Sequence, residues 1–521
     1  MDAALPEHIQ GLLSPKAYPH APREVELRQT HISYVFLADE LVYKLKKPLD
    51  LGFLDFTTLE KRRHFCEEEV RLNRRLCDGT YLGVVPVVAT DAGVRVEAEG
   101  EPIDFAVKMR RLPEDGMMTA VLERNTLTSA QLRQLAATIA EFHASSEHSE
   151  KIDELGGFET AKTNWEENFD QTVAKIGVTI SQEQFDGIRD FIDRQVKQSA
   201  DVFDLRAREG RIRDCHGDMR SDAVCFVKDS VCIYDCIEFN ERFRYSDVAS
   251  DVAFLAMDLE FRGYPELSDE LLGAYIGATG DSTLPLVLPF YKCYRAYVRG
   301  KVDGFQLDQP EIDDEQKRLV SEGARRYFDL AHQYATHSTP ATLVVMTGLT
   351  GTGKSHLGNA LAARLGAAVY SSDVVRKALL GLEATERRWE PFGAGIYNPE
   401  TTAMTYDALL SNARSMLERG RPVVLDASFL KRDEREAARR LAAETNAAFA
   451  VVECTTDEAT IKQRLDERAT EEVASDGRWE IYQRQLEVRE PIDELAAGSH
   501  LKVDSATPLS AQIEAVLKQL R

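Results

Sequence analysis

The sequence contains no apolar run that approaches the roughly 20 residues that a helix needs to cross a bilayer. Its first residues, MDAALPEHIQGLL, lack the basic start and the long apolar stretch of an export signal. Internal repeats and low-complexity tracts are absent as well. These absences argue against membrane-spanning and repeat architectures, and we expect a cytoplasmic protein without a membrane partner.

Cysteine is scarce, with eight residues scattered through a chain of 521. The closest pair, Cys232 and Cys236, has the spacing of neither a metal site nor a redox motif. We therefore expect reduced thiols rather than a disulfide framework.

Basic residues are outnumbered: 64 lysines and arginines stand against 87 aspartates and glutamates, which gives a net charge of −23. Nucleic acids and anionic membranes repel such a chain, except where a local basic groove forms. The composition disfavours nucleic acid as a partner and leaves the oligomeric state open.

The length and the 43% hydrophobic content predict about two to four folding units. In HQYATHSTPATLVVMTG a helical pattern gives way to small polar residues and then to an apolar strand. We expect a strand-rich small lobe over residues 1–113, a helical lobe over 114–337, and alternating strands and helices over 338–521. The alternation predicts a parallel sheet flanked by helices. The expected fold class is thus α+β followed by α/β.

The stretch GLTGTGKS, residues 348–355, matches the pattern G-x-x-x-x-G-K-S/T between an expected strand and an expected helix. Glycines allow backbone N–H groups to turn toward a phosphate, and the helix N-terminus adds its positive dipole end. Lys354 is expected to reach the β- and γ-phosphates of ATP, and Ser355 to bind Mg²⁺. The predicted nucleotide-binding residues of this stretch are Gly348, Gly351, Thr352, Gly353, Lys354 and Ser355.

Three further side chains of this part suit phosphoryl transfer. Asp426 ends the apolar strand of RPVVLDASF, where a carboxylate would complete the Mg²⁺ shell; a strand-end turn is the alternative. In YSSDVVRKAL, Asp373 is placed to accept a hydroxyl proton and Arg376 to stabilise phosphoryl charge. A helix N-cap followed by an exposed arginine would give the same pattern.

Two arginines, Arg464 and Arg468, lie four residues apart in IKQRLDERA on one face of an expected helix. Such arginines suit a lid that closes over the phosphates. The alternative is a solvated ladder of charges with Asp466 and Glu467.

Taken together, these pieces resemble P-loop kinases of the polynucleotide-kinase, zeta-toxin and gluconate-kinase type, which are AAA-family ATPase-like, over roughly residues 341–521. The D-x-x-R of Asp373 and Arg376 is similar to the substrate-side motif of the polynucleotide-kinase branch. The resemblance implies a phosphotransferase rather than a mechanical ATPase.

Three stretches before residue 338 indicate a second kinase. Lys44 ends the stretch LVYK on an expected strand. In kinases, a lysine on a strand of this kind contacts the α- and β-phosphates. Asp218 in CHGDMRSDAVCF matches the carboxylate that orients or deprotonates the acceptor hydroxyl, and Asp235 ends an apolar strand, where kinases keep an Mg²⁺-binding aspartate. The helix FCEEEVRLNRRL offers Glu68 or Glu69 as the ion-pair partner of Lys44.

Each of these residues also has a simpler explanation. Lys44, with Lys46 and Lys47 beside it, would belong to a solvated basic strand end. Asp218 would lie in a turn, and Asp235 would cap a strand. The order of the four residues, in a small lobe followed by a helical lobe, argues against coincidence.

This part resembles the aminoglycoside phosphotransferase and choline kinase family over roughly residues 20–330. The run DCIEFNERFRYSDVASDVAFLAMDLE is similar to a bacterial branch in which such a part is fused to a C-terminal P-loop kinase. The resemblance implies the bilobal fold of eukaryotic-like protein kinases, with ATP and Mg²⁺ as cofactors. It does not fix an acceptor.

The chain departs from the family pattern in two places. Five residues past the catalytic aspartate, where a kinase has a metal-binding Asn, it has Ala223. We expect Asp222 to replace the missing amide, with Glu238 as a further candidate carboxylate. The glycine-rich loop is absent too, and the hairpin tip RQTHISY offers Thr30 and Ser33 as polar substitutes.

The leading interpretation is an ATP-dependent phosphotransferase with two nucleotide sites. Each site would transfer the γ-phosphoryl group to a small hydroxylated acceptor, such as a sugar, an aminosugar or a nucleotide-like compound. One alternative makes the N-terminal part a degenerate kinase that binds ligand and regulates its neighbour. Another makes the C-terminal part an ATPase switch without an acceptor. The acceptors and the preference between ATP and GTP stay open.

Overall fold

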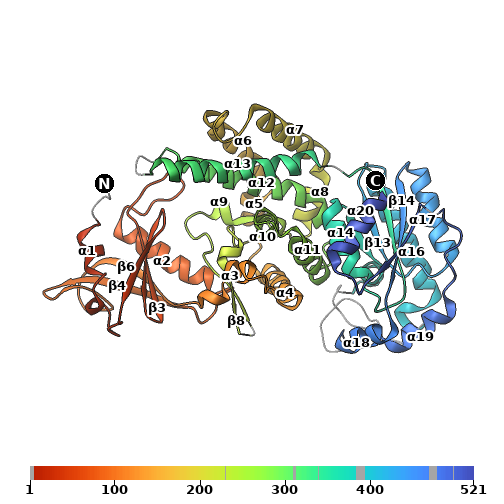
Figure 1. Ribbon diagram of the computed structural model, residues 1–521, viewed down its shortest axis with the longest axis horizontal. Coiled ribbons are helices and arrows are strands. Elements are labelled where there is room, and N and C mark those ends of the chain that lie inside the picture. Colours follow the sequence, from red (N-terminus) through yellow and green to blue (C-terminus); the bar gives the residue numbers. More distant parts are fainter. Residues whose placement is uncertain are drawn as a thin grey trace.

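Three parts follow one another along the long axis of the protein (Figure 1): a small lobe rich in strands, a helical lobe, and a part built on a parallel sheet. This architecture confirms the predicted fold class. Apart from the Arg468 side chain, the computed structural model describes residues 5–228, 230–308, 312–337, 339–382, 393–468, 478–496 and 498–520.

The small lobe is built around a six-stranded antiparallel sheet of order β1-β2-β3-β6-β4-β5, and helix α2 packs against β6 and β4. Its elements are α1 (Glu7–Gly11), β1 (Val25–Gln29), β2 (Ser33–Ala38), β3 (Leu41–Lys46), α2 (Leu59–Asn73), β4 (Tyr81–Thr90), β5 (Gly93–Val96) and β6 (Pro102–Arg110).

Local sequence explains how β3 and α2 are placed. The turn between β2 and β3 includes Asp39, which adopts a φ of 53°; aspartate tolerates this left-handed backbone better than most residues. Alternate residues of a strand share a face, so Lys44 and Lys46 of β3 point the same way. Helix α2 begins after Thr58, whose hydroxyl accepts a hydrogen bond of 3.2 Å from the Lys61 backbone nitrogen.

The helical lobe carries two short strand pairs that support the loops of the first candidate site. Its α4 begins with a capping box, in which Thr128 and Gln131 bond each other's backbone nitrogens. No helix of the described part of the chain is long and apolar enough to cross a membrane. The helices are α3 (Met118–Glu123), α4 (Ser129–Ser145), α5 (Glu150–Gly156), α6 (Phe158–Thr172), α7 (Gln182–Gln198), α8 (Ala200–Arg208), α9 (Glu241–Arg244), α10 (Val248–Phe261), α11 (Pro265–Thr279), α12 (Leu284–Gln306) and α13 (Asp314–Thr336), and the strands are β7 (Ile212–Asp214), β8 (Val224–Val227), β9 (Ser230–Ile233) and β10 (Tyr245–Asp247).

The last part has a five-stranded parallel sheet of order β12-β13-β11-β14-β15. Apolar side chains of α14 and α20 cover one face of it, and those of α16 and α17 cover the other. The elements are β11 (Thr342–Thr347), α14 (Lys354–Leu365), β12 (Ala368–Ser371), α15 (Ser372–Leu379), α16 (Pro399–Leu417), β13 (Val423–Asp426), α17 (Arg432–Glu444), β14 (Ala448–Thr455), α18 (Glu458–Arg468), α19 (Trp479–Val488), β15 (His500–Asp504) and α20 (Leu509–Leu520).

The expected part boundaries fall in connections between elements. The boundary at 113/114 lies between β6 and α3, and the boundary at 337/338 lies between α13 and β11. As limits of separate folding units, the ranges 1–113, 114–337 and 338–521 stay predictions.

The helical lobe and the parallel-sheet part pack directly against each other through α11 and α14 (Figure 1). A Cβ added to Gly273 of α11 would lie 3.0 Å from the backbone nitrogen of Ala360 on α14, so the two helices touch closely. Apolar side chains from both parts form one continuous buried cluster. Asp269 and Arg364 add an ion pair of 2.9 Å across the contact.

The expectation of reduced thiols throughout is wrong at one place. Cys77, just after α2, and Cys232 of β9 form a disulfide with their Cα atoms 4.5 Å apart. The two residues are 155 positions apart in the sequence, so spacing could not reveal the pair. The other six cysteines are free and buried.

Candidate active sites

Lys44 in the small lobe is held between two carboxylates that come from other elements. Its Nζ lies 2.9 Å from Oε1 of Glu69 on α2 and 2.7 Å from Oδ1 of Asp235, which follows β9. The Glu69 side chain is 1% exposed, whereas that of Asp235 is 55% exposed. The structure thus brings together three predicted residues, with the carboxylate of Asp235 open to solvent.

The choice between Glu68 and Glu69 is decided by the packing of α2. Adjacent helical residues point in different directions, and only Glu69 points inward to Lys44. Glu68 instead forms an ion pair of 2.7 Å with Arg71 on the same helix.

The electrostatics of this cluster keep its members charged. Burial acts to lower the pKa of Lys44, but the carboxylates of Asp235 and Glu69 outweigh it and raise the pKa well above its ordinary value. The Lys44 ammonium in turn lowers the pKa of Asp235. A charged lysine beside an exposed carboxylate can receive a phosphate and a divalent cation together.

The backbone around Asp235 is fixed from the small lobe. Asp235 adopts a φ of 65°, and its N–H donates to the Tyr81 hydroxyl at 3.4 Å. The next N–H, of Cys236, donates to Oδ1 of Asn73 on α2 at 2.9 Å. A non-glycine residue with positive φ needs such support from its surroundings.

Helices of the large lobe anchor the loop that carries Asp218. The backbone N–H groups of His216 and Gly217 donate to the two carboxylate oxygens of Asp251 on α10, at 2.6 and 2.9 Å. Arg295 of α12 donates to the Gly217 carbonyl at 2.9 Å. The loop is therefore held from both its N–H and its C=O groups.

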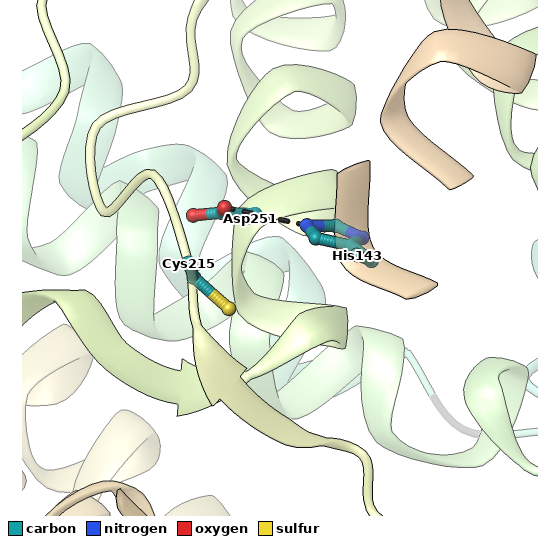
Figure 2. Close-up of side chains that lie close together, drawn as sticks. All are labelled: His143, Cys215 and Asp251. Carbon is teal, nitrogen blue, oxygen red and sulfur yellow. Dashed lines mark hydrogen bonds and ion pairs between the residues drawn. The ribbon is translucent and has the colours of Figure 1, made fainter. Parts of the chain in front are cut away.

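Asp251 also lies beside His143 and Cys215, and Figure 2 shows the three side chains together. Their ligand atoms lie within 4.8 Å of one another, an arrangement open to a metal ion. The geometry fits an anchor better, because burial raises the pKa of the Cys215 thiol and its sulfur donates to the Ser246 carbonyl. Burial acts to raise the pKa of Asp251 as well, but the hydrogen bond with His143 and nearby cationic groups lower it to about 2.

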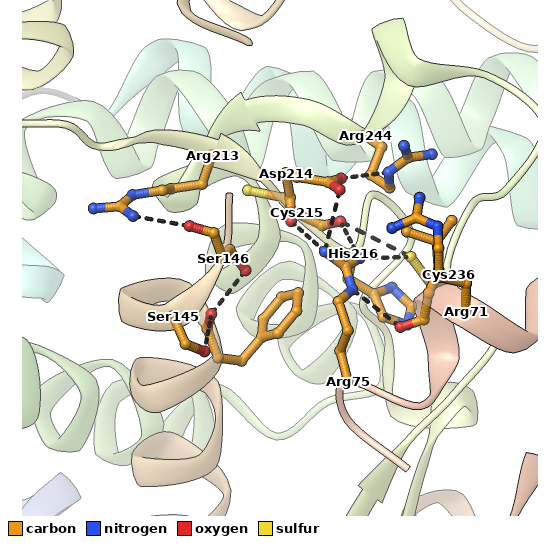
Figure 3. A network of polar contacts seen from close by, with 12 residues as sticks. Arg71, Arg75, Ser145, Ser146, Arg213, Asp214, Cys215, His216, Cys236 and Arg244 are labelled. Atoms are coloured by element: carbon orange, nitrogen blue, oxygen red, sulfur yellow. Dashed lines mark hydrogen bonds and ion pairs between the residues drawn. The ribbon is translucent and has the colours of Figure 1, made fainter. Parts of the chain in front are cut away.

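Arg75 connects the end of α2 to both loops of the site (Figure 3). Its guanidinium donates to the backbone carbonyls of Asp214 and Cys215, at 2.8 and 3.2 Å, and to the sulfur of Cys236 at 3.4 Å. Asp214 is bound in addition by Arg244. These contacts tie the small lobe to the segments that precede Asp218 and follow Asp235.

Asp218 forms an ion pair with Arg220, whose Nε lies 3.1 Å from Oδ1. Burial acts to raise the pKa of Asp218, but the Arg220 guanidinium outweighs it, so the pKa lies below its ordinary value. The same guanidinium binds Oδ2 of Asp222 at 2.8 Å. Ala223 presents a buried methyl group where a metal-binding amide was expected.

The hairpin tip between β1 and β2 carries Thr30 and Ser33. Thr30 accepts a hydrogen bond of 3.0 Å from the Ser33 backbone nitrogen, and the Ser33 side chain is buried. The use of these two residues as substitutes for a glycine-rich loop stays a prediction.

The second candidate site surrounds the loop between β11 and α14. Gly348, Gly351 and Gly353 have φ values of 135°, 81° and 91°, which favour glycine. A Cβ on Gly348 would lie 2.5 Å from the Cys454 carbonyl oxygen. The loop is a cradle that larger residues would distort, and Thr352 closes it by donating to the Leu349 carbonyl at 2.7 Å.

A cavity of about 660 Å³ joins this loop to the remaining predicted residues of the part. Lys354 and Ser355 line it together with Asp426 at the end of β13. Asp373 and Arg376 of α15 line the same cavity and form an ion pair of 3.3 Å. Nucleotide-side and acceptor-side candidates thus share one space.

The predicted lid arginines are only partly placed. Arg464 of α18 donates to the side chain and the carbonyl of Ser505, at 2.8 and 3.0 Å. Its Nη1 would lie 3.4 Å from a Cβ on Gly353, so it borders the phosphate loop. The Arg468 side chain lies outside the described residues.

Several residues of both sites were not predicted from the sequence. Gln485 of α19 accepts a hydrogen bond of 2.7 Å from the Thr350 backbone nitrogen and so reaches over the phosphate loop. The anchors of the first site lie far from it in the chain. Arg220, two residues past Asp218, and Lys46, two residues past Lys44, were visible as nearby charges. The residues missed are Lys46, Arg75, Arg220, Asp251, Arg295 and Gln485.

The uncharacterized protein Rv2004c of Mycobacterium tuberculosis is 31% identical over 445 residues, which cover 85% of this chain and 86% of that protein. The uncharacterized protein Mb2027c of Mycobacterium bovis matches equally. The chain belongs to the family of these mycobacterial proteins. Residues 343–492 also match the family model described as an AAA domain.

Two kinds of solved structure resemble parts of this chain. A gluconokinase from Sinorhizobium meliloti covers 35% of the chain and 93% of its own length, with 24% identity and a TM-score of 0.26. A choline kinase from Cryptosporidium parvum covers 63% of the chain and 95% of its own length, with 12% identity and a TM-score of 0.38.

The prediction of an ATP-dependent kinase is confirmed at the level of its class. The AAA-domain match spans the phosphate loop and Asp426, and the first two parts have the bilobal architecture expected of a kinase. The chain is a phosphotransferase with a nucleotide-binding P-loop part.

Proposed function

We propose that this phosphotransferase has two separate ATP sites, each of which serves a small hydroxylated acceptor such as a sugar, an aminosugar or a nucleotide-like compound. One observation carries the proposal: Lys44 lies between Glu69 and Asp235 in the small lobe, in a chain that also has the phosphate loop at Lys354. A chain with a single site would need only one of these arrangements.

In the N-terminal site, Lys44 binds the α- and β-phosphates and Glu69 orients it. The open carboxylate of Asp235 fits a divalent cation, with Asp222 as the second candidate ligand; Mg²⁺ bound here would neutralise phosphate charge. Asp218 accepts the proton of the acceptor hydroxyl, and its low pKa keeps it ionised for that role.

In the C-terminal site, the backbone of Gly348, Gly351, Thr352 and Gly353 wraps the phosphates. Ser355 and Asp426 are the candidates for Mg²⁺, and Lys354 reaches the terminal phosphates. On the acceptor side, Asp373 takes the hydroxyl proton and Arg376 stabilises the transferred group. Arg464 and Arg468 complete the proposed lid.

A regulatory N-terminal part is the second candidate, and one feature favours it. Ala223 removes the amide ligand, and Arg220 binds both Asp218 and Asp222. A kinase lobe that has lost turnover would still bind nucleotide and report on it to α14 through the packed α11.

The experiment that separates the two candidates is a screen of small hydroxyl compounds for ATP-dependent gain of mass. The full-length chain is compared with its Asp218→Asn and Lys354→Ala variants. Two active sites predict two groups of products, each lost in a different variant. Loss of all products in Lys354→Ala, with none lost in Asp218→Asn, supports the regulatory candidate instead.

A further inference from the structure

The Lys44 cluster extends inward through two residues that the proposed function does not use. Lys46 lies 2.8 Å from Oε2 of Glu69, and its ammonium also contacts Glu238. Lys44 binds the other oxygen of Glu69, and Asp235 binds Lys44. The charges alternate from the exposed carboxylate of Asp235 to the buried carboxylate of Glu238.

Burial prevents the inner pair from meeting a ligand directly. The side chains of Lys46 and Glu238 are 1% and 5% exposed, and the Lys46 ammonium lies 4.9 Å from the centre of the Phe56 ring. Burial acts to lower the pKa of Lys46, but Glu238 and Glu69 raise it. Lys46 is therefore charged, and its charge is directed at carboxylates rather than at solvent.

The five charged residues of this cluster come from only three segments of the chain. Lys44 and Lys46 lie on β3, Glu69 lies on α2, and Asp235 and Glu238 are three residues apart in one loop. A cation bound at Asp235 would compete with Lys44 for that carboxylate. The contact between Lys46 and Glu238 then still joins β3 to the loop of Asp235.

We propose that Lys46 and Glu238 are positioning residues of the N-terminal site. Lys46 occupies the second oxygen of Glu69 and so directs the first toward Lys44, while Glu238 holds the Asp235 loop against β3. The inference rests on the proposed ATP site. It also gives Glu238 a partner other than metal, although the sequence made it a candidate ligand.

The test uses the full-length Lys354→Ala chain as parent, so that the N-terminal site is read by itself. Glu238→Gln and the neutral pair Lys46→Met with Glu238→Gln are compared with the parent. The neutral pair guards against unfolding caused by one orphaned buried charge. Readouts are the Kd for ATP, bound Mn²⁺ by electron paramagnetic resonance, and kcat at saturating ATP.

We expect both variants to lower kcat by about 10- to 100-fold, because the reacting groups lose their alignment. They should still bind Mn²⁺ with ATP, with an affinity lowered by less than about tenfold. Glu238→Asp and Lys46→Arg, which keep the ion pair, should retain more activity than Glu238→Gln and Lys46→Met. Lys61→Met removes an exposed ion pair of the same lobe and serves as the control.

Two results would overturn this inference and leave the proposed N-terminal ATP site in place. A neutral pair with kcat within about twofold of the parent excludes a positioning role. Loss of bound Mn²⁺ in Glu238→Gln, to the extent seen in Asp235→Asn, makes Glu238 a ligand instead. A parent that binds no ATP overturns the proposed N-terminal site, and the inference with it, before any variant is compared.

Discussion

Lys44 and Lys354 are both proposed to contact the phosphates of ATP, yet their surroundings differ. Lys44 is fixed by carboxylates from α2 and from the loop after β9, which lie far from it in the sequence. Lys354 begins α14, directly after a loop whose shape comes from its own glycines. The first site is assembled from distant segments, whereas the phosphate loop of the second is built within one stretch of chain.

This difference decides where each site is vulnerable. In the first site, removal of one buried charge leaves its partners unpaired, which costs stability as well as function. In the second, the phosphate loop is shaped by its own backbone, so loss of the Lys354 charge acts on nucleotide binding and on the reaction rather than on stability. The following predictions test that contrast, from the largest expected effect to the smallest.

Asp218→Asn should lower N-terminal turnover by about 10²- to 10⁴-fold, because the acceptor proton loses its base. Turnover at the C-terminal site should not change. Acceptor-dependent product formation, measured by mass spectrometry with Lys354→Ala as the parent, checks the first part. An Asp218→Asn variant with parental turnover would remove this residue from the reaction.

Glu69→Gln should lower the free energy of unfolding by about 3–5 kcal/mol, because it removes a charge that Lys44 and Lys46 share in a buried site. The matched control is Glu68→Gln on the same helix, whose effect should be within about 0.5 kcal/mol. Urea unfolding followed by circular dichroism gives both values. Equal effects of the two variants would contradict the buried cluster.

Lys354→Ala should reduce C-terminal turnover by about 10²- to 10³-fold, since a charge that stabilises the transferred phosphate is lost. Its melting temperature without nucleotide should match that of the unmodified chain. Steady-state kinetics and a thermal melt are the measurements, and Lys502→Ala, which removes an exposed lysine of the same part, is the control. A strongly lowered melting temperature would show that this site, too, depends on buried charge.

The contact between α11 and α14 should make the free energy of unfolding depend on pH, with a smaller effect than the changes above. Burial raises the pKa of Asp269 from 3.8 to about 6, so the folded chain holds this proton more tightly than the unfolded chain does. The stability it contributes is full below about pH 4 and is lost as the pH rises through about 6. The loss should amount to about 2–3 kcal/mol.

The measurement for this prediction is urea unfolding of the wild-type chain and of Asp269→Asn across that pH range. The variant should lack the fall in stability that is specific to Asp269. Parallel curves for the two chains would show that Asp269 does not titrate at the contact between α11 and α14.

The two sites also differ in how much the sequence revealed. The phosphate loop was predictable with its flanking strand and helix, because its chemistry is local. Lys44, Asp218 and Asp235 were visible through their order along the chain. The choice between Glu68 and Glu69 was not, since it depends on how α2 packs.

The deeper parts of the first site required the structure. Lys46 looked like a solvated strand-end lysine, but its partners Glu69 and Glu238 lie 23 and 192 residues away. Asp251, which anchors the Asp218 loop, lies 35 residues from His216. Such pairings follow from tertiary packing, which no local spacing encodes.

The central claim is that one chain binds two nucleotides at separate sites. Equilibrium dialysis with ATP and Mg²⁺ tests it most directly, using the wild-type chain, Lys44→Met and Lys354→Ala. We predict two bound nucleotides per wild-type chain and one in each variant. A single bound nucleotide in the wild type, lost entirely in Lys354→Ala and retained in Lys44→Met, would contradict the claim.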